Sequence, residues 1–119
     1  MIDVAALQGI SYRELDCYHL VRKAFGMAGV ALPDYRYPGD DDTRAEMVRT
    51  ELRGWIKVER PRPMDVILLR VNGKPVHLGL VVGRGKFLHS EKPGTKSRID
   101  RWTDGMWQVE GFYRCPELA

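Results

Sequence analysis

The sequence predicts an α+β fold, and a change of pattern along the chain is the main reason. Residues 17–28 show the spacing of an amphipathic helix, with apolar residues one, three and four positions apart. After Pro63 the pattern becomes that of β-strands separated by short turns. A helix followed by antiparallel strands is typical of α+β proteins. The 119 residues, 44% of them hydrophobic, are enough for one domain over residues 1–119 with a single core.

The first helix is expected from about Cys17 to Ala28. Asp16 has the side chain of an N-cap, and Gly29 suits the residue that follows the helix. Pro33 prevents the helix from continuing. The apolar face is expected to consist of Leu20, Val21, Ala24, Phe25 and Ala28.

The next segments predict a loop and a weaker helix. Asp34–Asp42 is rich in Asp, Tyr, Pro and Gly, so it is expected to be a loop. The weaker helix is expected over Thr43–Arg53, where Gly54 ends it. Trp55–Val58 fits either a short strand or a turn. The apolar face of the weaker helix would be formed by Met47, Val48 and Leu52.

The second half of the chain predicts an antiparallel meander. Strands are expected at residues 65–71, 76–82, 86–89 and 108–113. Asn72-Gly73 is a typical two-residue hairpin turn. Gly83-Arg84-Gly85 is expected to form the following turn, with three residues. The strands would then pack against the first helix.

That three-residue turn would bring two histidines to the same face of the sheet. It pairs Val82 with Lys86 and Gly79 with His89, and His77 lies two residues from Gly79 on the same face. The two imidazoles are then diagonal neighbours, about 7 Å apart at Cβ. Gly79 leaves room above the sheet on that face. A turn of two or four residues would place the histidines on opposite faces.

Cys17, His77 and His89 are the candidate catalytic residues of a thiol hydrolase. At a helix start, the thiolate of Cys17 is stabilised by the partial positive charge of the backbone N–H groups. His77 is the candidate base that takes the thiol proton, and His89 the residue that orients the His77 ring. Each also has a structural interpretation: a small buried cysteine, a histidine exposed at a strand end, and a half-buried histidine with a backbone partner.

Tyr12 and Asp16 are further candidates, for oxyanion stabilisation or substrate binding. Tyr12 lies five residues before Cys17, and its hydroxyl would join the Cys17 backbone N–H as a donor to an oxyanion. Its alternative role is packing. His19 lies two positions after Cys17, and residues two apart on a helix do not face each other. His19 is therefore expected at the rim of the site or in solvent.

A zinc site formed by Cys17, His77 and His89 is an alternative use of the same side chains. The chain has no CxxC or HExxH spacing, so the prediction is a site without a metal or another cofactor. Both cysteines are expected to be reduced, with Cys115 a structural thiol near the C-terminus.

The composition narrows the range of partners. The net charge is +3, but positive and negative residues are interspersed and no basic stripe is present, so nucleic acid is not an expected partner. A modest attraction to anionic polymers such as the cell wall is compatible with this charge. No stretch approaches the ~20 apolar residues of a membrane span. The N-terminal residues also lack the basic and apolar regions of a signal peptide.

Four blocks of sequence place these candidates in a known order. The blocks are Asp16-Cys17-x-x-Leu20-Val21, Pro63-Met64-Asp65-Val66-Ile67-Leu68, His77-Leu78-Gly79-Leu80-Val81-Val82 and Phe87-Leu88-His89-Ser90. From about Tyr12 to His89 the chain resembles the NlpC-type peptidases, which are papain-like cysteine hydrolases of the bacterial cell wall. It departs from that family at Met64, where glycine is usual, and at Tyr18-His19, where Ser-Gly is frequent.

The resemblance implies a papain-like fold, with the helix that carries the nucleophile packed on an antiparallel meander. It assigns the nucleophile to Cys17, the base to His77 and the orienting role to His89. It also implies cleavage within the stem peptide of peptidoglycan, beside a D-glutamyl or diaminopimelyl residue.

The C-terminal segment Val109–Arg114 resembles the end of the family branch found in phage tail-tip assembly proteins. This implies phage tail-tip proteins as partners, and a location in the virion or in the host cytoplasm before assembly. The lack of a signal peptide and of a wall-binding domain agrees with delivery by a phage tail.

The sequence therefore predicts a cysteine endopeptidase that cleaves peptidoglycan and is carried by a phage tail or a related particle. One alternative is a structural tail-assembly protein with little or no catalysis. Another is a different papain-like amidase or acyl transferase, since the same triad serves all acyl transfers. Asp34–Asp42 and Ser90–Gly105 are expected to flank the cleft and cover it.

Overall fold

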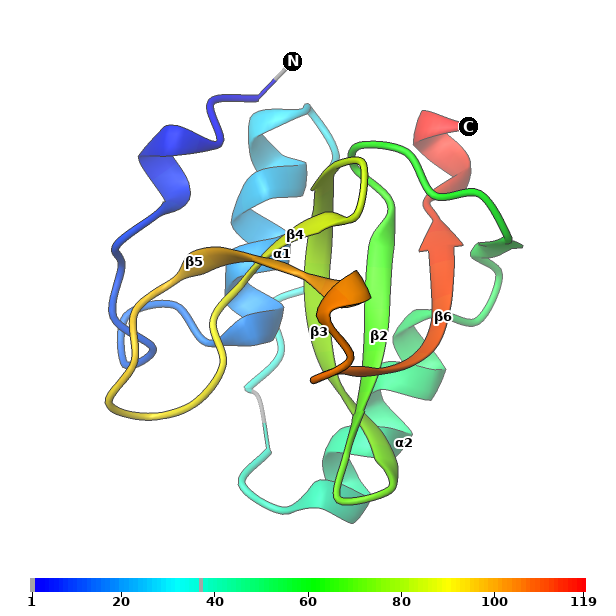
Figure 1. Cartoon of the computed structure of the whole chain (residues 1–119). Helices are drawn as coiled ribbons and strands as arrows, with labels where there is room; N and C mark the ends of the chain where they lie inside the picture. The colour runs from blue at the N-terminus through cyan, green and yellow to red at the C-terminus, as the bar shows by residue number, and fades with distance from the viewer. Residues whose placement is uncertain (1, 37) are drawn as a thin grey trace.

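The computed structural model describes residues 2–36 and 38–119 and confirms the α+β fold (Figure 1). Tyr37, in the predicted loop, lies outside the described residues. The helices are α1 (Cys17–Met27) and α2 (Asp41–Glu51), with short 3-10 helices η1 (Ala5–Leu7), η2 (Trp102–Asp104) and η3 (Pro116–Leu118). The strands are β1 (Ile56–Val58), β2 (Val66–Val71), β3 (Lys74–Gly83), β4 (Lys86–His89), β5 (Arg98–Arg101) and β6 (Gln108–Arg114).

The strands form one sheet in the order β1-β6-β2-β3-β4-β5, with every neighbouring pair antiparallel. β2, β3 and β4 form the predicted part of the meander, and β5, which was not predicted, extends it. β6 does not continue it, because it returns to the other edge of β2. Within the described residues, none of the helices has the length and apolar character needed to cross a bilayer.

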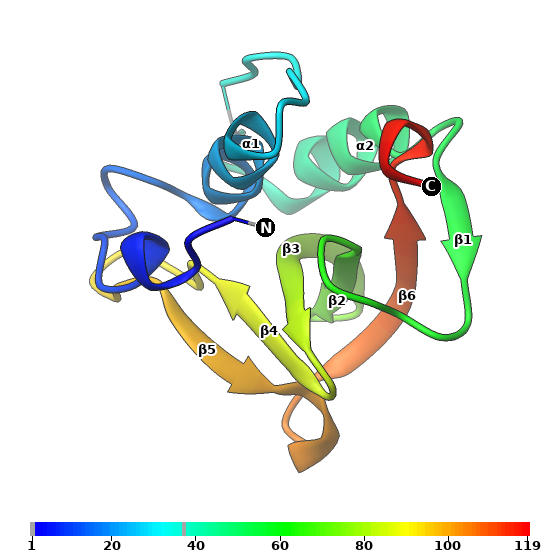
Figure 2. The ribbon, with the colours of Figure 1, turned by 90° about the horizontal axis from the view of Figure 1, so that it is seen from above.

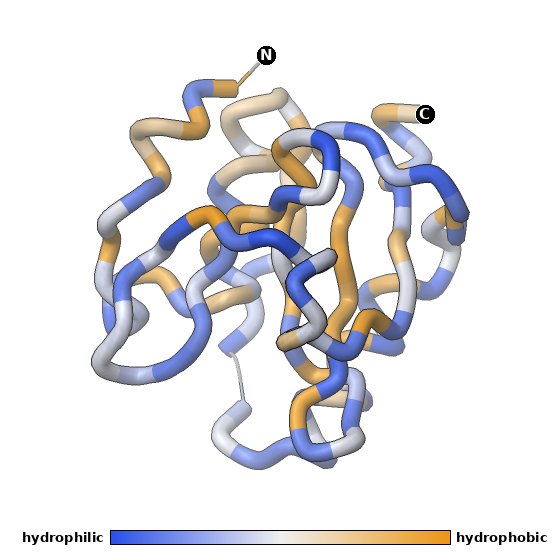
Figure 3. Tube along the Cα trace, in the orientation of Figure 1, coloured by the Kyte–Doolittle hydropathy of each residue, from blue (hydrophilic) through white to orange (hydrophobic). Residues whose placement is uncertain are grey.

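The sheet separates two apolar layers. α1 and α2 cover one face (Figure 2), where the main core packs side chains such as Leu20, Phe25 and Leu80. On the other face, Phe87 and its apolar neighbours are covered by Trp102 and aromatic residues beside it. The hydrophobic colouring follows this arrangement, with β2 and β3 as the central apolar strands (Figure 3). Both layers pack on the strands that carry the site.

The two helices begin at aspartate caps. Asp16 accepts a hydrogen bond from the His19 backbone N–H at 2.9 Å, as predicted for an N-cap. α2 begins two residues earlier than expected, because Asp40 accepts from the Thr43 backbone N–H at 2.9 Å. The negative charges of Asp41 and Asp42 in the first turn are favourable at this end of a helix.

The hairpin turns explain how the sheet keeps its register. Asn72 and Gly73 have φ values of 52° and 79°, as a type I′ turn requires. The next turn is shorter than predicted, since only Arg84 and Gly85 lie outside the strands. A bulge between Val81 and Gly83 compensates for this, so that Gly83, not Val82, pairs with Lys86.

The register beyond the bulge is the predicted one. Leu80 pairs with Leu88 and Val81 with Phe87. His77 and His89 therefore reach the same face although the turn has two residues, because the extra residue in the bulge restores the alternation. The expected pairing of Val82 with Lys86 was wrong for the same reason.

β5 was not predicted, and residues 90–105 were expected only to flank and cover the cleft. The strand has only four residues, of which Ile99 alone is apolar, so its sequence signal is weak. It pairs with the whole of β4, placing Phe87 opposite Asp100 and His89 opposite Arg98.

Candidate active site

Cys17 is the first residue of α1, and its thiol is almost completely buried at 1% exposure. Because Asp16 ends the preceding extended segment and caps the helix, Cys17 is held where the positive end of the helix dipole acts. This position stabilises a thiolate when the thiol loses its proton.

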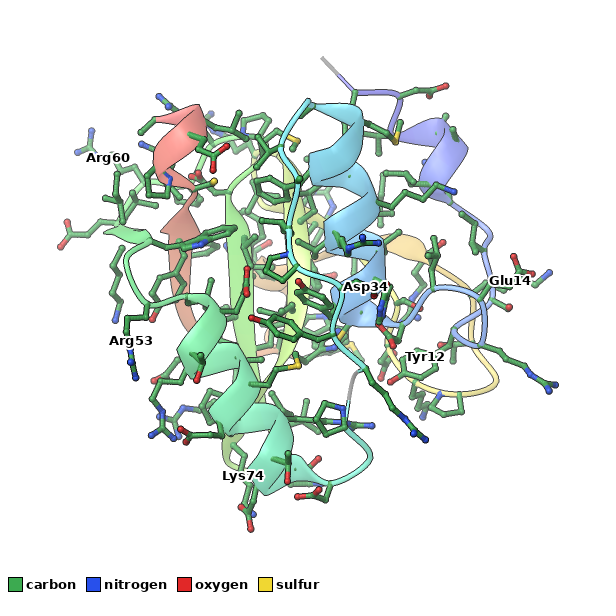
Figure 4. All side chains as sticks on the ribbon, turned by 180° about the vertical axis from the view of Figure 1, so that it is seen from behind. Tyr12, Glu14, Asp34, Arg53, Arg60 and Lys74 are labelled. Carbon is green, nitrogen blue, oxygen red and sulfur yellow. The ribbon has the colours of Figure 1, made fainter. Side chains whose placement is uncertain are left out.

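A small cavity of about 130 Å³ brings together three residues that the sequence singled out: Tyr12, Cys17 and His77. They come from the segment before α1, from its first turn and from β3. Figure 4 shows Tyr12 beside the beginning of α1. The rest of the lining consists of Asp41, Arg44, Val71, Val76, Glu91 and Lys92. A nucleophile, a candidate base and a hydroxyl therefore share one space.

His77 and His89 are linked directly by their rings. His77 Nε2 lies 2.8 Å from His89 Nδ1, a hydrogen-bond distance. Their exposures are only 4% and 0%. The backbone pairing of β3 and β4 ends at Leu80 and Leu88, so the two histidines lie beyond it and meet through their side chains. The predicted neighbourhood of these two residues is thus present.

The chain of contacts continues to Asp100, which the sequence analysis missed. His89 Nε2 lies 2.7 Å from Asp100 Oδ2, and Arg98 Nε donates to the same oxygen at 2.9 Å. The register of β4 and β5 puts these three side chains on one face. Alternation of polar residues with Ile99 was the one signal in the sequence that indicated a strand here.

Burial favours the neutral form of the His77 and His89 rings. The pKa of His77 is lowered to about 3, first by burial and then by the charges of His89, Arg98 and Arg44. The pKa of His89 is also lowered, because burial outweighs the opposing hydrogen bond to Asp100. At neutral pH a neutral His77 has a lone pair with which to accept a proton.

Tyr12 remains a proton donor at neutral pH. Its pKa is raised, first by burial and then by the negative charge of Cys17. The effect of Cys17 on this pKa agrees with their common position on the cavity. A protonated hydroxyl there has the chemistry of an oxyanion donor.

Asp16 has partners outside the cavity. Besides capping α1, its carboxylate lies 2.8 Å from Nδ1 of His19, whose Nε2 lies 3.0 Å from Asp34. Burial lowers the pKa of His19, but the bonds to these two carboxylates outweigh that effect and raise it overall. Through these contacts Asp16 and His19 join the beginning of α1 to Asp34 in the segment that follows the helix. A role for Asp16 toward substrate stays a prediction.

The room expected above Gly79 is filled. A Cβ added at Gly79 would lie 2.7 Å from Cδ2 of Phe87. The Phe87 ring in turn lies 4.4 Å, centroid to centroid, from the ring of His89, and Trp107 lies 5.0 Å from it. Gly79 therefore allows Phe87 to support the imidazole of His89 from below.

The zinc alternative finds no support among the described residues, where no group of three or more His, Cys, Asp or Glu side chains has a ligand arrangement. The facing nitrogens of His77 and His89 bind each other. Neither Cys17 nor Cys115 is in a disulfide, and Cys115 is buried in the main core.

Charged residues on the cavity were also missed by the sequence analysis. Arg44 comes from α2, and its charge reaches both Tyr12 and His77. Glu91 and Lys92 come from the segment expected to flank the cleft. These side chains reach the cavity through tertiary packing, since α1 and α2 both lie against β3.

Comparisons with known proteins show which family the chain resembles. A family model described as the NlpC/P60 family matches residues 6–113. The chain is also similar to the tail tip assembly protein K of Escherichia phage lambda, with 31% identity over 99 residues. That alignment covers 78% of this chain and 49% of the relative, so the chain spans about half the length of that protein.

Proposed function

Because the chain belongs to the NlpC/P60 family, we propose that it is a cysteine hydrolase that cleaves a peptide bond in the stem peptide of peptidoglycan. The observation that carries the proposal is the shared cavity of Cys17 and His77, with His77 bonded to His89 behind it. A buried thiol and a neutral imidazole at one cavity are the minimum for nucleophilic acyl transfer.

In the first half of the reaction, His77 takes the proton of the Cys17 thiol as the sulfur bonds to the amide carbon. The carbonyl oxygen becomes an oxyanion, for which the Tyr12 hydroxyl and the Cys17 backbone N–H are the proposed donors. The C–N bond then breaks, and His77 returns its proton to the leaving amine. The product is a thioester on Cys17.

In the second half, water attacks the thioester carbon. His77 accepts one proton of that water, the C–S bond breaks, and the proton returns to the sulfur. The acid is released and the thiol is restored, so the cycle needs no cofactor.

The tail-tip relative supports delivery of this activity by a phage tail or a related particle, with tail-tip proteins as partners. The assembly role in the name of that relative also supports a second candidate function: an assembly component with little catalysis. The two differ in the reactivity of Cys17, because an activated thiol is alkylated rapidly at pH 6, whereas an inert one is not.

The decisive experiment is digestion of purified peptidoglycan, with the fragments identified by mass spectrometry. Wild-type protein should release fragments cut within the stem peptide, and Cys17→Ala should release none. Cys115→Ala is the matched control, since it removes the other buried thiol from a position in the main core. Equal cleavage by Cys17→Ala would contradict the proposal. No cleavage by wild type, together with an unreactive Cys17, would favour the assembly role.

Tyr12→Phe tests the oxyanion assignment separately. Loss of one donor to the oxyanion should lower kcat by about 10²-fold with little change in KM. A variant with unchanged kcat would assign Tyr12 to packing.

A further inference from the structure

Asp100 ends a line of three side chains that leads away from the cavity. The line runs from His77 through His89 to Asp100, with distances of 2.8 Å and 2.7 Å between the bonded atoms. In each of these two hydrogen bonds one atom donates a proton and the other accepts it. Whether a ring nitrogen carries a proton therefore depends on the atom that it faces. The order of the links therefore determines which nitrogen of His77 faces Cys17 without a proton.

We infer that Asp100 is a positioning residue that fixes the tautomers of His89 and His77, and thereby leaves Nδ1 of His77 free to accept the proton of Cys17. This inference deepens the proposed function, because it concerns the proton transfer that begins the reaction. The positions of the protons on His77 and His89 can be measured whether or not the protein is an active enzyme.

The proton positions follow from the acceptor at the end of the line. The Asp100 carboxylate accepts hydrogen bonds, so Nε2 of His89 must carry a proton and donate it. In a neutral ring, Nδ1 of His89 is then an acceptor. Nε2 of His77 must donate to that acceptor, which leaves Nδ1 of His77 with its lone pair.

The opposite arrangement would make His77 useless as a base. If Nδ1 of His89 carried the proton, it would donate to Nε2 of His77, and His77 would hold its own proton on Nδ1. Both arrangements satisfy the bond between the two histidines equally well. Only the contact with Asp100 distinguishes them, because the reversed one would leave two lone pairs facing each other at 2.7 Å.

Arg98 holds Asp100 in place for this role. Its Nε donates to the same Oδ2 atom that faces His89, at 2.9 Å, while Nη2 of Arg98 contacts Glu91. Two donors thus converge on one oxygen. An asparagine at position 100 would place its carbonyl oxygen there and its amino group on the other side, so the bond from His89 would survive the loss of charge.

The same line also disperses charge when His77 becomes protonated. A proton moves from sulfur to Nδ1 of His77, the S–H bond breaks and an N–H bond forms. The imidazolium then donates from Nε2 to His89, whose own Nε2 proton points at the Asp100 carboxylate. The charge is stabilised within a buried site without any further proton leaving it.

The direct test is nitrogen NMR of the histidine rings, because the two nitrogens of a ring have different shifts with and without a proton. In wild-type protein at pH 7, His77 and His89 should both be protonated at Nε2 and bare at Nδ1. In Asp100→Ala, His77 should carry a substantial fraction of its proton on Nδ1. Asp100→Asn should keep the wild-type pattern, and Asp104→Ala, which removes an exposed carboxylate from η2, should change nothing.

Kinetics on peptidoglycan fragments give the second measurement. Asp100→Ala should lower kcat by about 10- to 100-fold with KM nearly unchanged, and Asp100→Asn should recover part of that loss. A wild-type His77 with its proton on Nδ1, or an unchanged pattern in Asp100→Ala, would overturn the inference. If wild type shows the expected tautomers but cleaves nothing, the proposed function fails while the positioning role of Asp100 stands.

Discussion

Asp65 and Asp100 each accept hydrogen bonds from an arginine, yet they do different work at two places on the sheet. Asp65 is 2% exposed, and Arg114 binds both of its oxygens at 2.8 Å. The Arg62 backbone N–H adds a third bond at 2.8 Å. Asp100 is partly exposed, and its Oδ2 atom faces one arginine and one histidine.

The difference lies in whether a partner is able to change its proton. Every donor on Asp65 belongs to a guanidinium or a backbone amide, and neither loses its proton under ordinary conditions. The bonds are fixed and join the beginning of β2 to the end of β6. His89, in contrast, carries a proton whose position Asp100 selects. Asp65 stabilises the fold, whereas Asp100 acts through His89 on the proton position of the His77 ring.

The largest expected effect is on stability at Asp65. Asp65→Ala should lower the free energy of unfolding by about 3 kcal/mol, because it breaks a buried pair and removes the acceptor for the Arg62 amide. Asp100→Ala should cost less, since the Asp100 carboxylate is partly exposed. Denaturant unfolding of both variants checks the contrast. Similar losses at the two sites would remove the distinction between a structural and a functional carboxylate.

A matched surface pair sharpens that measurement. Glu110 binds Arg70 through two hydrogen bonds, at 2.8 Å and 3.0 Å, but the pair lies at the surface. Glu110→Ala should therefore be far milder than Asp65→Ala, although both remove a carboxylate with two bonds to an arginine.

Acid should destabilise the protein through the buried His77. The pKa of His77 is about 3 in the folded chain, against an ordinary value near 6.5 in the unfolded chain. Between these values the unfolded state binds a proton that the folded state does not. The contribution of His77 to stability is therefore complete above pH 6.5 and is lost as the pH decreases toward 3, by up to about 1.4 kcal/mol per pH unit.

His77→Gln should flatten this dependence, as measured by unfolding at a series of pH values. His19→Gln is the control with the opposite sign. The pKa of His19 is raised in the folded chain, so its contribution is present below pH 6.5 and is lost as the pH rises through the higher folded value. A His77→Gln protein with the wild-type slope would show that His77 is accessible to protons in the folded state.

The sequence was sufficient for features that depend on local chemistry. The cap at Asp16, the turn at Asn72-Gly73 and the apolar strands β2 and β3 all have strong local signals. The ordered Cys17, His77 and His89 were found because each lies within such an element. The predicted turn after β3 was one residue too long, and the bulge in β3 was not predicted. The two errors offset each other, so the predicted register of the histidines is still correct.

Asp100 and Arg44 could not be found in the same way. β5 has four residues and one apolar side chain, and its place depends on pairing with β4 and on the isolated bridge between Ser11 and Lys96. Arg44 reaches the cavity only because α2 packs beside β3. Both positions result from tertiary packing, which local periodicity does not encode.

A smaller effect is expected at Gly79, beneath the histidine pair. Gly79→Ala should destabilise by about 2 kcal/mol, because the added methyl group would lie 2.7 Å from Phe87 and 3.1 Å from Ile67. Gly83→Ala is the control in the same strand, since nothing lies within 4 Å of its added Cβ. Displacement of Phe87 should also disturb His89, which NMR of the ring nitrogens would detect. Equal stability of the two variants would show that Phe87 yields without cost.

The smallest expected effect on stability is at the turn formed by residues 62–65, which ends at Asp65. The Asp65 N–H donates to the Arg62 carbonyl at 3.0 Å, Pro63 follows Arg62, and Met64 has a φ of 76°. This is a type II turn, whose third position favours glycine, and it explains why relatives of the NlpC type have glycine where this chain has methionine.

Met64 is also packed against the main core, so a direct replacement by glycine would mix loss of packing with relief of strain. Comparing two truncations separates these effects. Met64→Gly and Met64→Ala lose nearly the same contacts, but only glycine adopts the left-handed conformation without a steric penalty. Met64→Gly should therefore be the more stable by about 1 kcal/mol, the reverse of the order usual in a helix. If alanine is the better residue, the turn must relax when the side chain is shortened, and the Asp65–Arg114 pair is then less rigidly placed than its bonds indicate.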